Sequence, residues 1–294
     1  MKNNISAINS QTGTFKKVLA LLCIISMMSC NEDFLERKPK GQLTYDTFFE
    51  TPDHAVWATN AIYQQFRSWE MCAFPWIGIT DIISDDADKG STPSDAPYVL
   101  ELDDFYFDQT NAAVSGAWLG TYQAIFRANL AIENIPTIDM DTVLRSRLIG
   151  EAKVLRAYAY FRLVQWFGDV PLVTRILNDD EYYNQSRTSK EVVLDFIEND
   201  LITAIDVLPE KSDYKTADLG RVTKGAARGI LAKVYMVRHD FPKAVLQCDS
   251  IISSGEYYLL TRYSENFLPE GENGGESIFE IGAVAAQAAI AGPG

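Results

Sequence analysis

The stretch from residue 142 to residue 167 most narrows what this chain can fold into, because it is apolar on nearly every side. Its apolar stripe and the aromatic residues around it are Leu148, Ala152, Leu155, Ala159, Leu163 and Phe167, with Tyr158, Tyr160, Phe161 and Trp166. A helix that is apolar all round belongs in the middle of a core. Gly168 and Pro171 are expected to end this helix.

Two earlier stretches also carry helix signals. Thr51, Pro52 and Asp53 supply an N-cap, a proline at the first helical position and an acidic first turn. They predict a helix that runs to about Trp69. A second helix is expected over about 115–135, where Pro136 stops it.

A later helix is predicted over about 188–208. Thr188 and Glu191 have the spacing of a capping box, and apolar residues then recur every three to four positions up to Pro209. The acidic residues on its other face are Glu191, Asp195, Glu198 and Asp206. We expect this acidic face to be exposed to solvent.

Residues 225–254 have the spacing of a tetratricopeptide helix pair. Ala232 and Ala244 would let two antiparallel helices approach closely, while Tyr235 and Phe241 would fill the gap between repeats. The helices at 142–167 and 188–208 form a second, weaker pair. The predicted fold is therefore all-α, with tetratricopeptide-like stacked helix pairs, long irregular loops and a few short strands, such as 257–260 and 277–281.

The first thirty residues resemble the leader of a bacterial lipoprotein. Lys16 and Lys17 precede an apolar run over 18–28, which is too short to span a bilayer, and Ser29 then precedes Cys30. We expect residues 1–29 to be a signal peptide, Cys30 to be the acylated N-terminus and residues 30–50 to be a tether. The alternative is a free cysteine near the end of the chain.

Charge and motif content exclude several functions. The chain has 26 Lys and Arg against 40 Asp and Glu, a formal charge of -14, which argues against nucleic acid and favours neutral, cationic or apolar partners. Its four cysteines have no C-x-x-C pair, and no hydrolase, phosphate-binding or metalloprotease motif is present. His54 and His239 both lie in expected helix starts or turns. We expect no catalysis, cofactor or metal, although sequence spacing leaves a glycosidase pair among the carboxylates open.

The loop over about 80–108 is the predicted ligand region, because it is long, rich in Pro, Gly and Ser, and carries polar and aromatic groups. Sugars are held by flat aromatic faces together with fixed polar groups. The candidate ligand-binding residues in and beside this loop are Trp69, Trp76, Asp85, Asp86, Lys89 and Tyr98. A tryptophan beside a helix is more often core, and the aspartates at 85, 86 and 88 suit a solvated turn better than a Ca²⁺ site.

Six motifs then occur in one order along the chain, at residues 118–129, 150–158, 167–173, 187–189, 220–227 and 276–281. They read WLGTYQAIFRAN, GEAKVLRAY, FGDVPLV, RTS, GRVTKGAA and ESIFEI. This succession resembles the SusD/RagB family. The resemblance covers the chain from about Asp33 to Ile281, so 51–281 is expected to be a SusD-like helical-repeat domain.

The resemblance implies a non-catalytic surface lipoprotein of Bacteroidetes. Such proteins bind oligosaccharides, or sometimes peptides, and deliver them to a SusC-like TonB-dependent transporter in the outer membrane. It also implies that the 80–108 loop holds ligand, although this loop has no aromatic residue between Thr80 and Pro97. The acidic residues after Cys30 resemble a surface-export signal, and an ordinary solvated tether is the equal alternative.

Family members are usually much longer, so the chain is expected to be a fragment or the product of a truncated gene, with 282–294 as an unstructured or truncated end. The alternative function is that of a helical-repeat scaffold or remnant, which docks on the transporter without binding nutrient itself.

Overall fold

The computed structural model describes residues 48–282, and residues 49–282 belong to a single packing unit. The predicted signal peptide, Cys30, most of the tether and the end at 283–294 lie outside the described residues. The α-helices are α4 (Pro52–Phe66), α5 (Trp69–Cys72), α6 (Phe74–Ile77), α7 (Pro97–Asp103), α8 (Ala112–Asn134), α9 (Thr142–Phe167), α10 (Asp179–Tyr182), α11 (Lys190–Ile205), α12 (Lys224–Val237) and α13 (Phe241–Ser253). A π-helical turn covers Gly78–Ile82, and the strands β1 (Val170–Pro171) and β2 (Arg187–Thr188) pair antiparallel.

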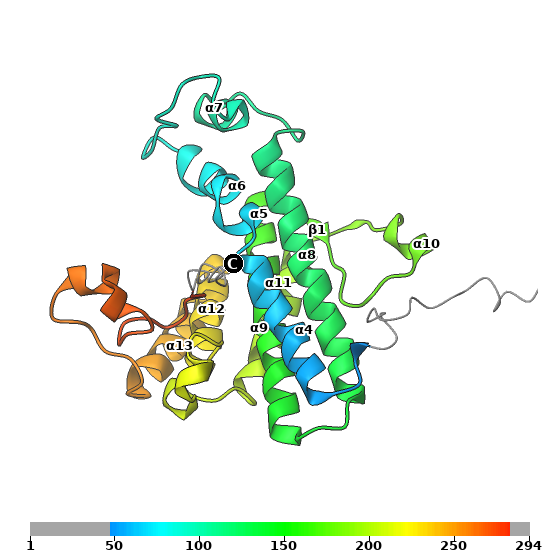
Figure 1. Cartoon of the computed structure of the whole chain (residues 1–294). Coiled ribbons are helices and arrows are strands. Elements are labelled where there is room, and N and C mark those ends of the chain that lie inside the picture. The colour runs from blue at the N-terminus through cyan, green and yellow to red at the C-terminus, as the bar shows by residue number, and fades with distance from the viewer. Residues whose placement is uncertain (1–47, 283–294) are drawn as a thin grey trace, which may run out of the picture. The chain divides into compact units, whose positions relative to one another are not determined.

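Helix α9 is the centre of this arrangement (Figure 1). It packs against α11, α8 and α4, and more lightly against α12. Leu155, Ala159 and Leu163 are fully buried in it. The helix ends at Gly168, whose φ of +68° a side chain would disfavour. The predicted central helix is confirmed with both of its boundaries.

The described residues have the predicted all-α fold, and both predicted helix pairs are present. Helix α9 packs on α11, and α12 packs on α13 with Ala232 and Ala244 buried between neighbours. Phe241 does not fill a gap between repeats, because half of its side chain is exposed.

The predicted strands at 257–260 and 277–281 were wrong. Tyr258 N donates to the Gly275 carbonyl at 3.0 Å, but Leu260 N donates to the side chain of Glu276, so no ladder continues. Within residues 48–282 the sheet consists of β1 and β2, with Val170 opposite Thr188.

The predicted start of α11 was also wrong. Thr188 belongs to β2, so its side chain caps no helix, and the N-cap Ser189 makes no side-chain capping bond. Lys190 N instead donates to Asp169 Oδ1 at 2.8 Å, across the hairpin. The helix ends at Ile205, three residues before the predicted boundary.

Two other helix ends were shifted. Helix α4 ends at Phe66 rather than at Trp69. Helix α8 begins at Ala112, because the side chain of Asn111 accepts from Ala113 N and Val114 N and so caps it three residues before the predicted start.

The acidic face of α11 is only partly solvated. Glu198 accepts from the Tyr235 hydroxyl and from Arg238 Nη1, both at 2.9 Å, and Arg238 also pairs with Asp195. These contacts join α11 to α12, which periodicity within one helix cannot reveal.

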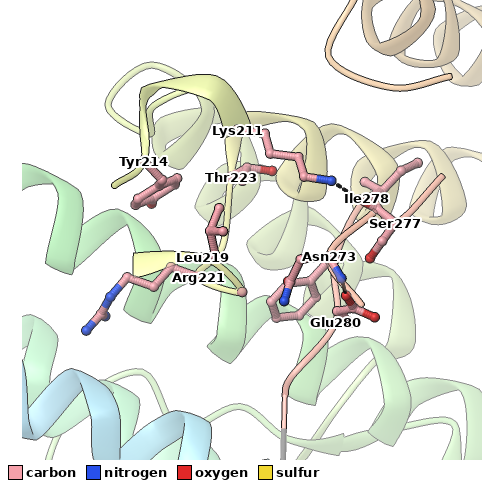
Figure 2. A pocket seen from close by; sticks show the side chains of 11 residues that line it. Lys211, Tyr214, Leu219, Arg221, Thr223, Asn273, Ser277, Ile278 and Glu280 are labelled. Atoms are coloured by element: carbon pink, nitrogen blue, oxygen red, sulfur yellow. Dashed lines mark hydrogen bonds between the residues drawn. The ribbon is translucent and has the colours of Figure 1, made fainter. Parts of the chain in front are cut away.

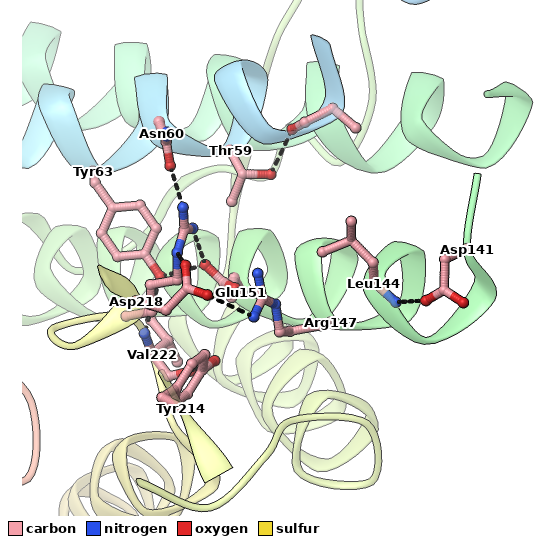
Figure 3. A network of polar contacts seen from close by, with 12 residues as sticks. Thr59, Asn60, Tyr63, Asp141, Leu144, Arg147, Glu151, Tyr214, Asp218 and Val222 are labelled. Atoms are coloured by element: carbon pink, nitrogen blue, oxygen red, sulfur yellow. Dashed lines mark hydrogen bonds and ion pairs between the residues drawn. The ribbon is translucent and has the colours of Figure 1, made fainter. Parts of the chain in front are cut away.

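A buried polar network ties α4 and α9 to the segment before α12 (Figure 3). Glu151 on α9 is fully buried and accepts from the Tyr63 hydroxyl at 2.7 Å and from Arg221 Nη1 at 2.9 Å. Tyr63 also accepts from Val222 N, and Arg221 donates to Asn60 and Asp218. Burial, and next the charge of Glu151, raise the pKa of the Tyr63 hydroxyl, so it stays protonated as a donor.

Glu151→Gln is expected to lower the free energy of unfolding by about 3 kcal/mol, because it leaves the Arg221 guanidinium without its buried counter-charge. Urea unfolding would measure this. The control Glu270→Gln alters an exposed residue and should change stability by less than about 0.5 kcal/mol. Equal effects of the two variants would contradict a stabilising role for the network.

Candidate functional site

A groove of about 390 Å³ lies between α8 and the segment that leads from β1 to β2. We call residues 171–186 the arm. Figure 1 shows it extending from β1 to α10, beside α8. Helix α8 lines the groove with Trp118, Leu119, Tyr122, Gln123, Ile125, Phe126 and Asn129, and the arm lines it with Pro171, Val173, Arg175, Leu177, Tyr182 and Gln185.

The groove face of α8 follows from helical spacing. Trp118, Tyr122 and Phe126 lie at i, i+4 and i+8, so they share one side of the helix. Gly116 and Gly120 lie on the other side, against α5 and α6. A Cβ on Gly120 would stand 2.7 Å from the Cβ of Glu70, so this close packing requires glycine. Helices α5 and α6 thereby cover the glycine face of α8, while its aromatic face lines the groove.

The aromatic floor is held by ring contacts from the core. Trp118 lies 4.9 Å from Tyr122 and 5.0 Å from Phe167, measured between ring centroids, and the second contact is edge-to-face. Tyr122 meets Tyr160 edge-to-face at 6.5 Å. Aromatic pairs prefer such tilted arrangements. The floor is therefore fixed by α9 before any ligand binds.

The arm is tied to the core through its backbone. Tyr122 donates its hydroxyl to the Pro171 carbonyl at 2.8 Å. The Tyr160 hydroxyl donates to the Val173 carbonyl at 2.8 Å and accepts from Val173 N at 2.7 Å. Burial raises the pKa of both tyrosines, so both hydroxyls stay protonated.

Arg156 makes the deepest attachment of the arm. Its side chain is buried on α9, where Nε and Nη2 bind the two carboxylate oxygens of Asp200 at 2.8 and 2.9 Å. Its Nη1 donates to Asn129 Oδ1 at 2.6 Å and to the Thr174 carbonyl at 3.1 Å. Asn129 in turn donates to the Val173 carbonyl at 2.9 Å.

The chemistry of the groove suits a ligand with both C–H faces and hydroxyl groups. Its floor presents aromatic rings, and Gln123 offers an amide donor and acceptor at a position exposed to solvent. Gln185 is also exposed and offers its amide oxygen, since its Nε2 already donates to the Glu181 carbonyl at 2.7 Å. Among the described residues that line the groove, none carries a carboxylate. A pair of acids for glycoside hydrolysis is thus not found there.

Two other hollows lack these features. The hollow in Figure 2 has room for about 20 Å³ and is closed by Lys211, whose Nζ donates to the carbonyls of Gly274 and Ser277. A space of that size suits a water molecule. A broader hollow of about 520 Å³ is lined by Arg67 and Arg221, but its one aromatic side chain, Tyr63, is engaged by Glu151.

None of the six predicted ligand residues lines the groove. Trp69 is 56% exposed and packs against Phe74, whereas Trp76 is half-buried between the Arg162 guanidinium and the edge of Trp166. Trp69 therefore offers an open ring and Trp76 a packed one.

The other four predicted residues, at 85, 86, 89 and 98, lie within the 80–108 loop. Asp85 and Asp86 are exposed, and Lys89 Nζ donates to Ser91 Oγ and to the Thr92 carbonyl. The half-buried Tyr98 accepts from Asn111 through its carbonyl. In this part of the described chain, no hydrogen bond or ring contact joins any two of the six predicted residues.

The groove residues were missed because an aromatic row on a helix usually indicates core. The sequence signal was the i, i+4, i+8 row of Trp118, Tyr122 and Phe126. Finding the site also required the arm, whose contacts with α8 span 44 to 49 residues of sequence.

Residues 48–282 contain no helix that is both long and apolar enough to cross a bilayer. In the same range, His, Cys, Asp and Glu side chains form no group of three or more placed to hold a metal ion.

Tyr160→Phe is expected to loosen the arm, because it removes the acceptor of the Val173 amide and one donor to the Val173 carbonyl. Hydrogen exchange at the Val173 amide should become at least about tenfold faster. The control Tyr235→Phe removes a hydroxyl that binds Glu198 and should leave that amide unchanged. Unaltered exchange at Val173 in Tyr160→Phe would contradict this attachment.

Known proteins resemble this chain in sequence and structure. SusD-like protein P25 of Formosa agariphila is 26% identical over 273 residues, which cover 90% of this chain and 51% of that protein. A SusD-like protein of Bacteroides ovatus is 30% identical over 269 residues, which cover 86% of this chain and 47% of that protein. The chain spans about half the length of these curated relatives.

A solved structure described as surface glycan-binding protein A from Bacteroides thetaiotaomicron in complex with laminarihexaose is also similar, with a TM-score of 0.68 and 26% identity. The similarity covers 79% of this chain and 49% of that one. The sequence model of a SusD-like family, described as "Starch-binding associating with outer membrane", matches residues 79–236, more than half of the chain. The chain therefore belongs to the SusD-like family.

Proposed function

We propose that this chain binds an oligosaccharide in the groove between α8 and the arm and does not convert it chemically. The observation that carries the proposal is the row of Trp118, Tyr122 and Phe126, which lines one groove together with Tyr182 and the amides of Gln123 and Gln185. Aromatic faces stack on the C–H faces of pyranose rings, and the amides bind hydroxyl groups. The similarity to a protein solved with laminarihexaose supports a glycan ligand.

The proposed function also includes where the protein is attached and where its ligand goes. The protein is anchored by acylated Cys30 in the outer membrane, faces the cell exterior and passes its ligand to a SusC-like TonB-dependent transporter. The lipoprotein-like leader supports the anchor. The description of the matching family supports the outer membrane.

The 80–108 loop remains a proposed second contact with ligand, through Trp69, Trp76, Asp85, Asp86, Lys89 and Tyr98. The open ring of Trp69 and the exposed carboxylates of Asp85 and Asp86 support this role. Trp76 is the weakest member, since its ring packs against Arg162 and Trp166.

The alternative function is a scaffold that docks on the transporter without binding nutrient. Its specific support is an apolar row on α13, where Phe241, Val245 and Ile252 are at least half exposed. Exposed apolar patches of this kind often mark protein interfaces. This function predicts transporter binding that is independent of the groove.

Tyr182→Ala is expected to weaken oligosaccharide binding about tenfold, because it removes the exposed ring on the arm side of the groove. Calorimetry with a panel of neutral hexasaccharides, including laminarihexaose and maltohexaose, would measure the dissociation constant. Tyr263→Ala is the matched control, since Tyr263 is 77% exposed, has a similar edge-to-face contact with Phe267 and does not line the groove.

Binding by Tyr263→Ala should stay within about twofold of the unaltered protein. Equal losses in both variants would place the ligand elsewhere. The absence of saturable binding to any hexasaccharide, with transporter co-purification retained, would contradict nutrient binding and favour the scaffold.

Cys30→Ala is expected to move the protein from the membrane fraction to the soluble fraction, because the acyl chains supply the attachment. Cell fractionation followed by immunoblotting would measure the shift. Cys23→Ala, within the predicted signal peptide, is the control and should leave the protein in the membrane fraction. Unchanged fractionation of Cys30→Ala would refute lipidation.

A further inference from the structure

We propose that the groove selects uncharged glycans over anionic ones, and that Glu181 sets this selection by occupying Arg175. The inference rests on the proposed glycan-binding function and names the ligand class of that site. Arg175 is the one charged residue among the described residues that line the groove. Its availability therefore decides whether a carboxylate or sulfate on a sugar finds a partner there.

The Arg175 guanidinium is already hydrogen-bonded within the arm. Its Nη1 donates to Glu181 Oε2 at 2.8 Å and to the Ile176 carbonyl at 3.1 Å, and its Nη2 donates to Glu181 Oε1 at 2.5 Å. Such a two-fold pairing is the arrangement in which arginine binds a carboxylate most strongly. An anionic sugar would have to displace Glu181 to gain the same bonds.

Glu181 is held in place by the start of α10. Asn178 and Glu181 form a reciprocal capping box, in which Glu181 N donates to Asn178 Oδ1 at 3.0 Å and Asn178 N donates to Glu181 Oε2 at 3.1 Å. The Arg175 bond, and next the Asn178 backbone bond, lower the pKa of Glu181 to about 2. The carboxylate is therefore charged at neutral pH.

The surroundings of this pair are acidic. Glu133 accepts from Ile176 N at 2.8 Å, and Asp179 and Asp180 occupy the first turn of α10. Together with the charge of -14 on the whole chain, these groups repel an anionic ligand. A neutral glycan loses nothing here, since the aromatic floor and the amides of Gln123 and Gln185 carry no charge.

The test is a competition experiment on the full chain. The best-binding neutral hexasaccharide of the panel is bound first, and hexagalacturonate is added as the anionic competitor, so that only binding in the same site is scored. The unaltered protein should bind hexagalacturonate at least about tenfold more weakly than the neutral sugar at low salt. Added salt should reduce that difference, because it screens repulsion.

Glu181→Gln is expected to strengthen hexagalacturonate binding about tenfold, since it frees Arg175, and to leave neutral binding within about twofold. Added salt should now weaken the anionic ligand, which reverses the sign of the salt dependence. Asp179→Asn is the matched control, because it removes the same charge from α10 without releasing Arg175. The double variant Arg175→Gln/Glu181→Gln should lose the gain.

Three results would overturn the inference. If hexagalacturonate and unlabelled neutral sugar compete equally for the unaltered protein, the proposed selection against anionic glycans is wrong, while the proposed glycan binding stands. If Asp179→Asn gives the same gain as Glu181→Gln, the effect is one of net charge and not of Arg175. If no glycan binds at all, the proposed function fails together with its ligand class.

Discussion

The buried guanidinium of Arg156 is the contact on which the rest of this structure depends. A charge removed from water is costly unless hydrogen bonds and an opposite charge satisfy it. Arg156 meets this condition by binding Asp200 on α11, Asn129 on α8 and the Thr174 carbonyl of the arm. The centre of the Phe196 ring also lies 4.8 Å from the guanidinium carbon, Cζ. Four separate parts of the chain must therefore come together around one side chain, and the groove wall is one of them.

Glu151, five residues before Arg156 on α9, is a second buried charge that needs partners. It draws Tyr63 of α4 and Arg221 from before α12 toward the same helix. Apolar packing around α9 supplies buried area, and charged hydrogen bonds add a demand for fixed directions. The two buried charges thus reinforce the relative placement of helices that apolar packing brings together.

Sequence reasoning found what is local and missed what is distant. The bounds of α9, its end at Gly168 and the α12–α13 pair could be predicted, because periodicity and helix-stop residues act within a few turns. Thr188 was misread because strand pairing with Val170 overrides a capping signal. Glu151 and Arg156 stood inside a motif that was recognised, but their partners Tyr63 and Asp200 lie 88 and 44 residues away. The groove was missed for the same reason, since its arm is fixed by side chains that bind distant carbonyl groups.

The short pairing of β1 with β2 has a consequence for how this protein can change over evolutionary time. It brings both ends of the arm together at the edge of the core, and so separates the arm's length from the stability of the helices. Closing a loop of twice the length costs only about 0.6 kcal/mol more. Insertions or exchanges between Leu177 and Arg187, beyond the bonds that tie residues 171–176 to α8 and α9, can therefore reshape one wall of the groove while the aromatic floor stays as it is.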